Sequence, residues 1–143
     1  MSGPESAFWV ELRACMLGLW DAQRHEDQSP GVPDVSFCAS GHDGWIELKT
    51  IPLLPKRATT TIKVPHLTAF QRSWLIRRAR AGSAVFIFLK TPGINIWENK
   101  HYFLFDKESV PFVGKMVLKE MIQQAVYSED HLDSDLLLKA LTA

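Results

Sequence analysis

The segment "GWIELKTI" (residues 44–51) constrains the fold most strongly, because charged and apolar side chains alternate along it. Successive side chains of a β-strand point to opposite faces of the sheet. Glu47 and Lys49 therefore share one face, whereas Ile46 and Leu48 point to the other. A strand that buries a carboxylate and an ammonium group needs a partner that compensates their charges, so this segment predicts either a solvated sheet face or a functional site.

The preceding apolar run supplies a second carboxylate. The run "VPDVSFCA" (32–39) contains one charged residue, Asp34, near its start, and "SGHDG" (40–44) joins it to the next run. A short connector made of Gly, Asp and Ser is typical of a β-hairpin. Such a hairpin places Asp34 beside the middle of the following strand. We therefore expect Asp34, Glu47 and Lys49 to cluster on one face of a sheet.

The whole pattern predicts a mixed α/β fold in one domain over residues 1–143, with a core at about 7–106 and C-terminal helical segments at about 107–143. The expected elements are helices at 7–22 (capped by Ser6) and 68–82 (capped by Thr68), strands at 32–39, 44–51, 83–90 and 101–106, and short helices within 107–127 and 130–141. Their order is α-β-β-α-β-β-α. Loops are expected at 24–31 and 52–67, and 93–99 reads as a strand or a turn.

Several classes of protein are disfavoured. No apolar run approaches the roughly 18 residues of a membrane span, and the first residues lack a signal-peptide pattern, so we expect an intracellular (cytoplasmic) protein. Cys15 and Cys38 lie among apolar residues without metal-ligand spacing, which predicts buried free thiols in a reducing compartment. The five histidines show no HxH or HExxH spacing, which argues against zinc.

The charges are separated along the chain although the formal net charge is zero. Residues 56–90 contain eight basic residues and no acid, so one face can attract a phosphate backbone. Arg72 and Arg80 share a helix face that Arg77 does not, so these arginines cannot all contact one duplex. The candidate contacts with nucleic acid are Lys56, Arg57, Lys63 and Arg72.

The three clustered charges suit one type of chemistry. Two neighbouring carboxylates repel unless they share a cation, and Mg²⁺ prefers oxygen ligands and retains several waters. A bound divalent ion polarises a phosphoryl group, and a nearby lysine stabilises the developing charge. Taken alone, a Glu-x-Lys pair on a strand is more often a weak surface ion pair. The "PD" at the start of the adjacent strand favours phosphodiester hydrolysis over that interpretation.

These motifs resemble the PD-(D/E)XK nuclease superfamily, and most closely its virus-type replication-repair nuclease (VRR-NUC) branch. The resemblance covers about residues 7–90 and rests on Glu11 in the first helix, "GVPDV", "IELKT" and "FQRSWLIRRARAG", in that order. It implies a restriction-endonuclease-like core that cuts DNA with Mg²⁺ or Mn²⁺. It further implies that Asp34 and Glu47 bind the metal with the Leu48 carbonyl, that Lys49 is catalytic, that Glu11 reaches the metal directly or through water, and that Gln71 orients the lysine or the phosphate.

The resemblance leaves three functions open. The first is a structure-specific DNA endonuclease, such as a resolvase of four-way (Holliday) junctions that acts as a homodimer; by resemblance, a small domain of this kind suits a virus or a mobile element. The second is the same chemistry on flaps, nicks or a specific site. The third is a non-catalytic nucleic-acid-binding module. Trp9, Trp20 and Trp97 are candidates for core, interface or base-stacking positions, and core is favoured for all three.

Overall fold

The computed structural model describes residues 3–26 and 30–143 of the chain. Residues 27–29, within the loop expected at 24–31, lie outside this description. The elements are α1 (Pro4–Cys15), β1 (Asp21–Arg24), β2 (Val35–Ala39), β3 (His42–Thr50), α2 (Ala69–Arg80), β4 (Ala84–Pro92), β5 (Lys100–Phe105), the 3₁₀ helix η1 (Val110–Phe112), α3 (Leu118–Gln124), β6 (Tyr127–Glu129) and α4 (Ser134–Leu141).

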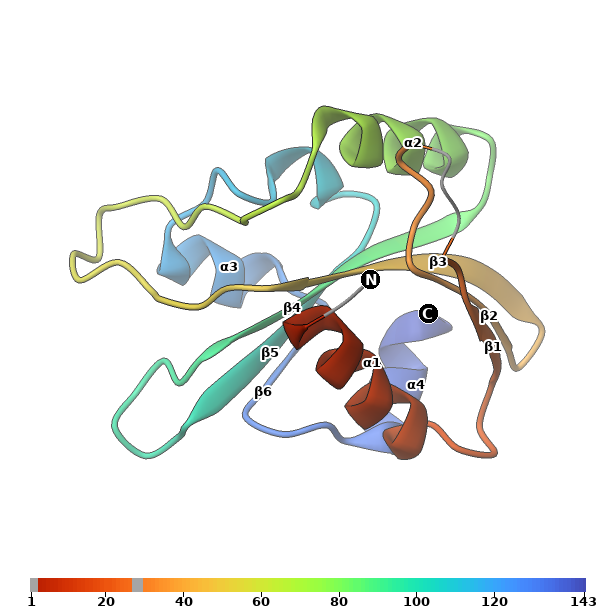
Figure 1. The fold of residues 1–143 in the computed structure, drawn as a ribbon, viewed down its shortest axis with the longest axis horizontal. Coiled ribbons are helices and arrows are strands. Elements are labelled where there is room, and N and C mark those ends of the chain that lie inside the picture. Colours follow the sequence, from red (N-terminus) through yellow and green to blue (C-terminus); the bar gives the residue numbers. More distant parts are fainter. Residues whose placement is uncertain (1–2, 27–29) are drawn as a thin grey trace.

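A mixed sheet lies at the centre, with its strands in the order β1-β2-β3-β4-β5-β6. Every neighbouring pair is antiparallel except β3 and β4, which are parallel and are joined through α2. Strand β4 is nearly continuously apolar, as expected of a central strand that is covered on both faces. Figure 1 shows α1 and α4 on one side of the sheet and α2 and α3 on the other.

Each face of the sheet contributes to its own core. Ile46, Leu48 and Phe88 pack with α1 and α4 on the first face. Ile87 and Leu89 pack with α2, α3 and η1 on the second face. The alternation of side chains along β3 and β4 therefore decides which helices each strand residue meets.

The first helix differs from the expected one. Helix α1 ends at Cys15 rather than near residue 22, and Gly3 with Pro4 at the first turn takes the place of the expected Ser6 cap. The chain then turns through Gly18, whose φ of 80° only glycine adopts freely. The residues that follow form β1, which was not expected, because a four-residue polar edge strand has no apolar run to reveal it.

The C-terminal part is also less helical than expected. Helices α3 and α4 lie in the two predicted segments, but Tyr127–Glu129 forms β6 and pairs with β5. Residues 93–99, expected as a strand or a turn, form a turn between β4 and β5. The cysteines are free as expected, but Cys38 is exposed rather than buried because it points away from the core on β2.

Within the described residues, no helix is long and apolar enough to cross a membrane.

Candidate active site

The β2–β3 hairpin places Asp34 beside Glu47. Ser40 and Gly41 form its tight turn, both with positive φ, as a two-residue hairpin turn requires. Val35 pairs with Ile46, so Asp34, the preceding residue, lies next to Glu47. Its Oδ2 atom accepts a hydrogen bond of 2.9 Å from the Leu48 amide. The first carboxylate is therefore held by the backbone of the strand that carries the second.

Lys49 lies beside the carboxylates on the same face of β3. Its Nζ atom is 3.6 Å from Glu47 Oε2 and donates a 3.0 Å hydrogen bond to the His66 carbonyl oxygen. Both side chains are buried, with exposed fractions of 2% for Glu47 and 7% for Lys49. His66 has a left-handed φ of 64°, which is uncommon for a residue other than glycine, and its carbonyl is aimed at the ammonium group.

Glu47 lacks full compensation for its charge. Its Oε1 atom is buried and has no hydrogen-bond partner among residues 3–26 and 30–143. Burial, followed by the hydrogen bond and the negative charge of Asp34, raises the pKa of Glu47 well above its ordinary value, and Lys49 opposes this only in part. A buried carboxylate oxygen without a partner is costly unless a cation is supplied.

The donor set fits a hard divalent cation. Two carboxylates are available, and the N–H and C=O of a strand residue point to the same side, so the Leu48 carbonyl faces the Asp34 side as its amide does. No three His, Cys, Asp or Glu side chains are grouped closely enough for a metal ion within residues 3–26 and 30–143. Mg²⁺ is bound through one or two carboxylates and retains several waters, so two carboxylates suffice for it.

The first turn of α2 packs against the loop that leads to Asp34. Gly31 has φ +86°, and a Cβ atom built on it would lie 2.5 Å from the Phe70 carbonyl oxygen. Gln71 forms a capping box with Thr68, in which its Oε1 atom accepts the Thr68 amide at 3.0 Å. Helix α2 therefore begins as predicted. No hydrogen bond joins Gln71 to Lys49 among the contacts that the structure describes, and its role there remains a prediction.

We expect Gly31→Ala to destabilise the protein by about 3 kcal/mol, since it combines an unfavourable φ with a backbone clash. Gly18→Ala is the matched control, because Gly18 has φ +80° with nothing near its added Cβ atom, and should cost about 1 kcal/mol. Urea unfolding measures both. Equal losses would show that the contact with α2 does not position the Asp34 loop.

Glu11 is not brought to this site. It accepts hydrogen bonds from Lys90 and from the Tyr102 hydroxyl, the latter at 2.6 Å, on the face of the sheet that packs against α1. Burial raises the pKa of Glu11, but these hydrogen bonds outweigh burial and hold it below the ordinary value. The expectation that Glu11 helps to bind the metal is therefore not carried forward, because Glu47 and Lys49 point to the opposite face.

The expected basic contacts divide into two groups. Lys56, Arg57 and Lys63 are exposed on the irregular segment between β3 and α2. We call residues 52–63 the basic arm. Arg72 instead donates hydrogen bonds of 2.6 and 2.7 Å to the carbonyls of Val110 and Val113, so it ties α2 to η1. The Arg72 guanidinium is occupied by these contacts, and we do not retain it among the proposed DNA contacts.

The three tryptophans differ in how far they are buried. Trp9 is buried and Trp20 is partly buried, and both belong to the core on the α1 side. Trp97 is 87% exposed, so the expectation of a core position is wrong for this residue. The role of the His66 carbonyl was missed as well. No sequence signal marks it, because any residue type carries a backbone carbonyl.

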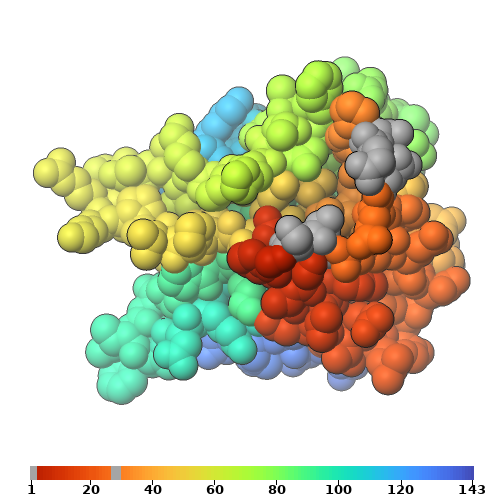
Figure 2. All heavy atoms as spheres, viewed as in Figure 1, coloured from red at the N-terminus to blue at the C-terminus, as the bar shows by residue number. Residues whose placement is uncertain are grey.

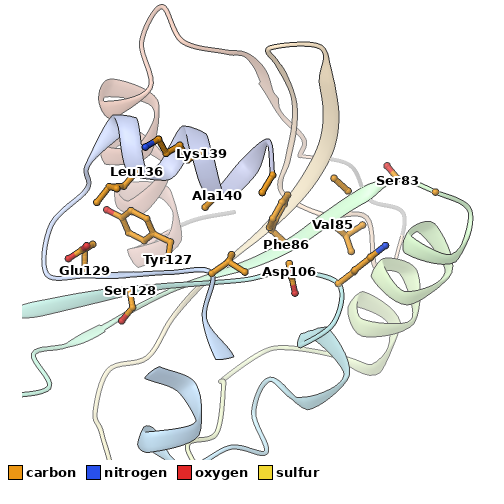
Figure 3. A pocket seen from close by; sticks show the side chains of 15 residues that line it. Ser83, Val85, Phe86, Asp106, Tyr127, Ser128, Glu129, Leu136, Lys139 and Ala140 are labelled. Atoms are coloured by element: carbon orange, nitrogen blue, oxygen red, sulfur yellow. The ribbon is translucent and has the colours of Figure 1, made fainter. Parts of the chain in front are cut away.

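A pocket of about 600 Å³ lies away from the candidate site, at the other end of β4. Figure 3 shows its lining residues, among them Phe86 of β4, Tyr127 of β6 and Ala140 of α4. Glu47 and Lys49 pair with the later residues Ile87 and Leu89, and they do not line this pocket.

Comparison with solved structures supports the fold. The chain aligns with the Holliday junction resolvase Hjc of Archaeoglobus fulgidus, an archaeal hyperthermophile, over 95% of this chain and 97% of that one, with a TM-score of 0.55 and 17% sequence identity. The chain has the restriction-endonuclease-like fold. No protein-family model and no curated protein sequence matches it.

Proposed function

We propose that this chain is a divalent-metal-dependent DNA endonuclease that hydrolyses phosphodiester bonds in four-way junctions as a homodimer. The observation that carries the proposal is the buried Glu47 Oε1 atom, which lacks a hydrogen-bond partner in the described part of the chain. This atom lies in a site that also holds a second carboxylate and a fixed lysine. A surface ion pair, the alternative for Glu47 and Lys49, would leave both groups in water, whereas here both are buried.

The residues of the site would have two separate roles, metal binding and stabilisation of the phosphate charge. Asp34, Glu47 and the Leu48 carbonyl would hold Mg²⁺ or Mn²⁺, which supplies a Lewis acid at the scissile phosphate. The Lys49 ammonium has three N–H donors, of which one is engaged by the His66 carbonyl, and Glu47 Oε2 lies 3.6 Å away as its ion-pair partner. A free N–H can donate to the phosphate oxygen that gains charge, or orient the attacking water. Because His66 and Glu47 fix this group in advance, little reorganisation is needed during the reaction.

The substrate is proposed from the fold and from the order of motifs. The structural neighbour is described as a Holliday junction resolvase, and this chain matches nearly all of its length. Resolution needs two paired cuts, which a twofold dimer with two sites supplies. Assignment to the VRR-NUC branch rests on the motifs "GVPDV", "IELKT" and "FQRSWL" alone.

Cleavage assays test the proposal directly. The wild type is incubated with four-way junctions, flaps and linear duplexes, with Mg²⁺ or with a chelator. Symmetric, Mg²⁺-dependent nicks on the junction support the proposed function. Preferential cutting of flaps or nicked duplexes would keep the chemistry but replace the substrate. Tight binding without any metal-dependent product would instead indicate a non-catalytic module.

The basic arm should contribute backbone contacts to DNA. We expect Lys56→Ala/Arg57→Ala to weaken DNA binding and to reduce the slope of log K against log salt by about 1 to 2, as the loss of one or two phosphate contacts would. Lys107→Ala/Lys139→Ala is the charge-matched control, because both lysines line the pocket at the far end of β4. If both double variants lower the slope equally, the arm has no specific role.

A further inference from the structure

We propose that Trp97, at the turn between β4 and β5, is a stacking wedge that inserts between bases at the branch point of the DNA substrate. We call residues 93–99 the hairpin tip. The inference rests on the proposed function and extends it by naming a residue that recognises a branch. The first observation is that Ile96 and Trp97 are neighbours and each 87% exposed, so they form a contiguous apolar surface at the tip of the turn.

The hairpin tip is rigidly built. Glu98 is buried, with 8% of its side chain exposed, and its Oε1 atom accepts the Ile94 amide and the His101 ring, both at 2.8 Å. Asn95 Oδ1 accepts the Trp97 amide at 2.8 Å. A Cβ atom on Gly93 would lie only 2.0 Å from the Glu98 carbonyl oxygen, so the two sides of the turn are in close contact.

This scaffold is anchored to the sheet. His101, which holds Glu98 through Nδ1, contacts Ser128 Oγ of β6 at 2.8 Å through Nε2, and its ring lies 4.6 Å from that of Phe103. Trp97 is therefore presented to solvent by a preorganised turn. Preorganisation reduces the entropy lost on binding, and an indole ring offers a large stacking surface with few rotatable bonds.

The positive charge near the tip favours DNA as the partner. Glu98 is the only acidic residue between positions 48 and 105, and its carboxylate is buried in the turn. Lys100 is exposed beside the tip, but Glu129 of β6 lies close by, opposite Tyr102 of β5. The attraction for a phosphate backbone therefore comes chiefly from the exposed basic side chains of the basic arm.

The hairpin tip and the basic arm project from the same end of the sheet. β3 leads into the arm after Thr50, which pairs with Lys90, and β4 leads into the tip only a few residues later. Figures 1 and 2 show the two as separate projections on one side of the molecule. A duplex contacted by the arm would therefore bring its neighbouring bases toward Trp97. Bases at a branch point are the least costly to unstack, because their stacking is already interrupted.

The test uses a four-way junction with 2-aminopurine beside the branch point, and a chelator to prevent cleavage. We expect wild-type protein to change the 2-aminopurine fluorescence. Trp97→Ala should abolish that change and bind the junction about tenfold more weakly, while its affinity for linear duplex falls less than about twofold. Trp97→Phe should restore much of the effect. Leu17→Ala, at a site 81% exposed in the turn that follows α1, is the matched apolar control and should change neither the fluorescence nor the affinity.

The outcomes separate this inference from the proposed function. If the wild type cuts junctions but Trp97→Ala binds and selects them equally well, the wedge is refuted and the nuclease function stands. If sedimentation shows that Trp97→Ala dissociates a dimer, the tip is a protein interface and the inference is refuted. If the wild type neither binds nor cuts DNA, both proposals fail. Because Trp97 is exposed, all variants should share one melting temperature.

Discussion

Glu47→Gln should abolish metal-dependent cleavage and, at the same time, stabilise the metal-free protein at neutral pH. When Glu47 is ionised, the site holds two carboxylates and one ammonium group, so a net negative charge lies beside the buried Glu47 side chain. The substitution leaves Asp34 and Lys49 as a balanced pair. We expect an increase of about 1 to 2 kcal/mol in the free energy of unfolding without metal. Loss of a direct ligand should reduce activity by more than about a hundredfold.

The pH dependence of this effect follows from the direction of the pKa shift. The pKa of Glu47 is raised in the folded state. The folded protein therefore binds more protons than the unfolded chain between the two pKa values. Protonated Glu47 therefore stabilises the folded state. This stabilisation is complete at pH values below the pKa that Glu47 has in the unfolded chain, and it is lost as the pH rises through the pKa that Glu47 has in the folded protein. The difference between the wild type and Glu47→Gln should thus be small at pH values below the unfolded pKa and largest above the folded pKa of Glu47.

Thermal unfolding with and without Mg²⁺ measures the change in stability and the binding of the metal, and the junction cleavage assay measures the activity. Mg²⁺ should raise the melting temperature of the wild type, because the ion binds the native state alone, and should leave that of Glu47→Gln nearly unchanged. Asp34→Asn is the matched variant, since it removes the other carboxylate and should behave in the same way. A wild-type melting temperature that ignores Mg²⁺ and Mn²⁺ at millimolar concentration would contradict the proposed metal site.

Lys49→Ala should have the opposite effect on stability. It leaves two neighbouring carboxylates without their buried cation, so the metal-free protein should lose up to about 3 kcal/mol at pH 8. Cleavage should fall by about a hundredfold to a thousandfold, as when one preorganised donor is removed from a developing oxyanion. The melting temperature should still rise with Mg²⁺, and by more than in the wild type, because both carboxylates are retained.

The double variant Glu47→Gln/Lys49→Met provides the control. Its site keeps only Asp34, so its stability without metal should lie above that of Lys49→Ala. Stability and turnover then separate the two roles of the lysine, as a counterion and as a catalytic group. Wild-type turnover in Lys49→Ala would remove Lys49 from the catalytic assignment, whatever its effect on folding.

Local sequence was enough to predict the part of the site that one hairpin builds. The two-residue period of a strand places Glu47 and Lys49 on one face, and a short Gly-containing turn places Asp34 next to them. Contacts of this kind depend on residues fewer than about twenty positions apart. The same local reasoning predicted α2, because its capping residues lie next to its first turn.

Contacts between distant segments could not be predicted in this way. Glu11 meets Lys90 and Tyr102 because α1 packs on the face of the sheet opposite to the carboxylates. Arg72 meets the carbonyls of Val110 and Val113 because η1 lies against α2. In the sequence, Glu11 cannot be told from a metal ligand, and Arg72 cannot be told from a residue that contacts phosphate, because charge and position in the motif are the same in either case. Only the packing of separate elements decides whether such a charge already has a partner.

The strand alternation, the hairpin and the start of α2 can be read from the amino-acid sequence, because each follows from interactions between near neighbours along the chain. Three other features depend on how distant segments pack: the buried Glu47 oxygen without a partner among the described residues, the contact of the His66 carbonyl with Lys49, and the exposure of Trp97. Burial is a property of the whole packed molecule: the same side chain is covered or exposed according to which distant segments fold against it.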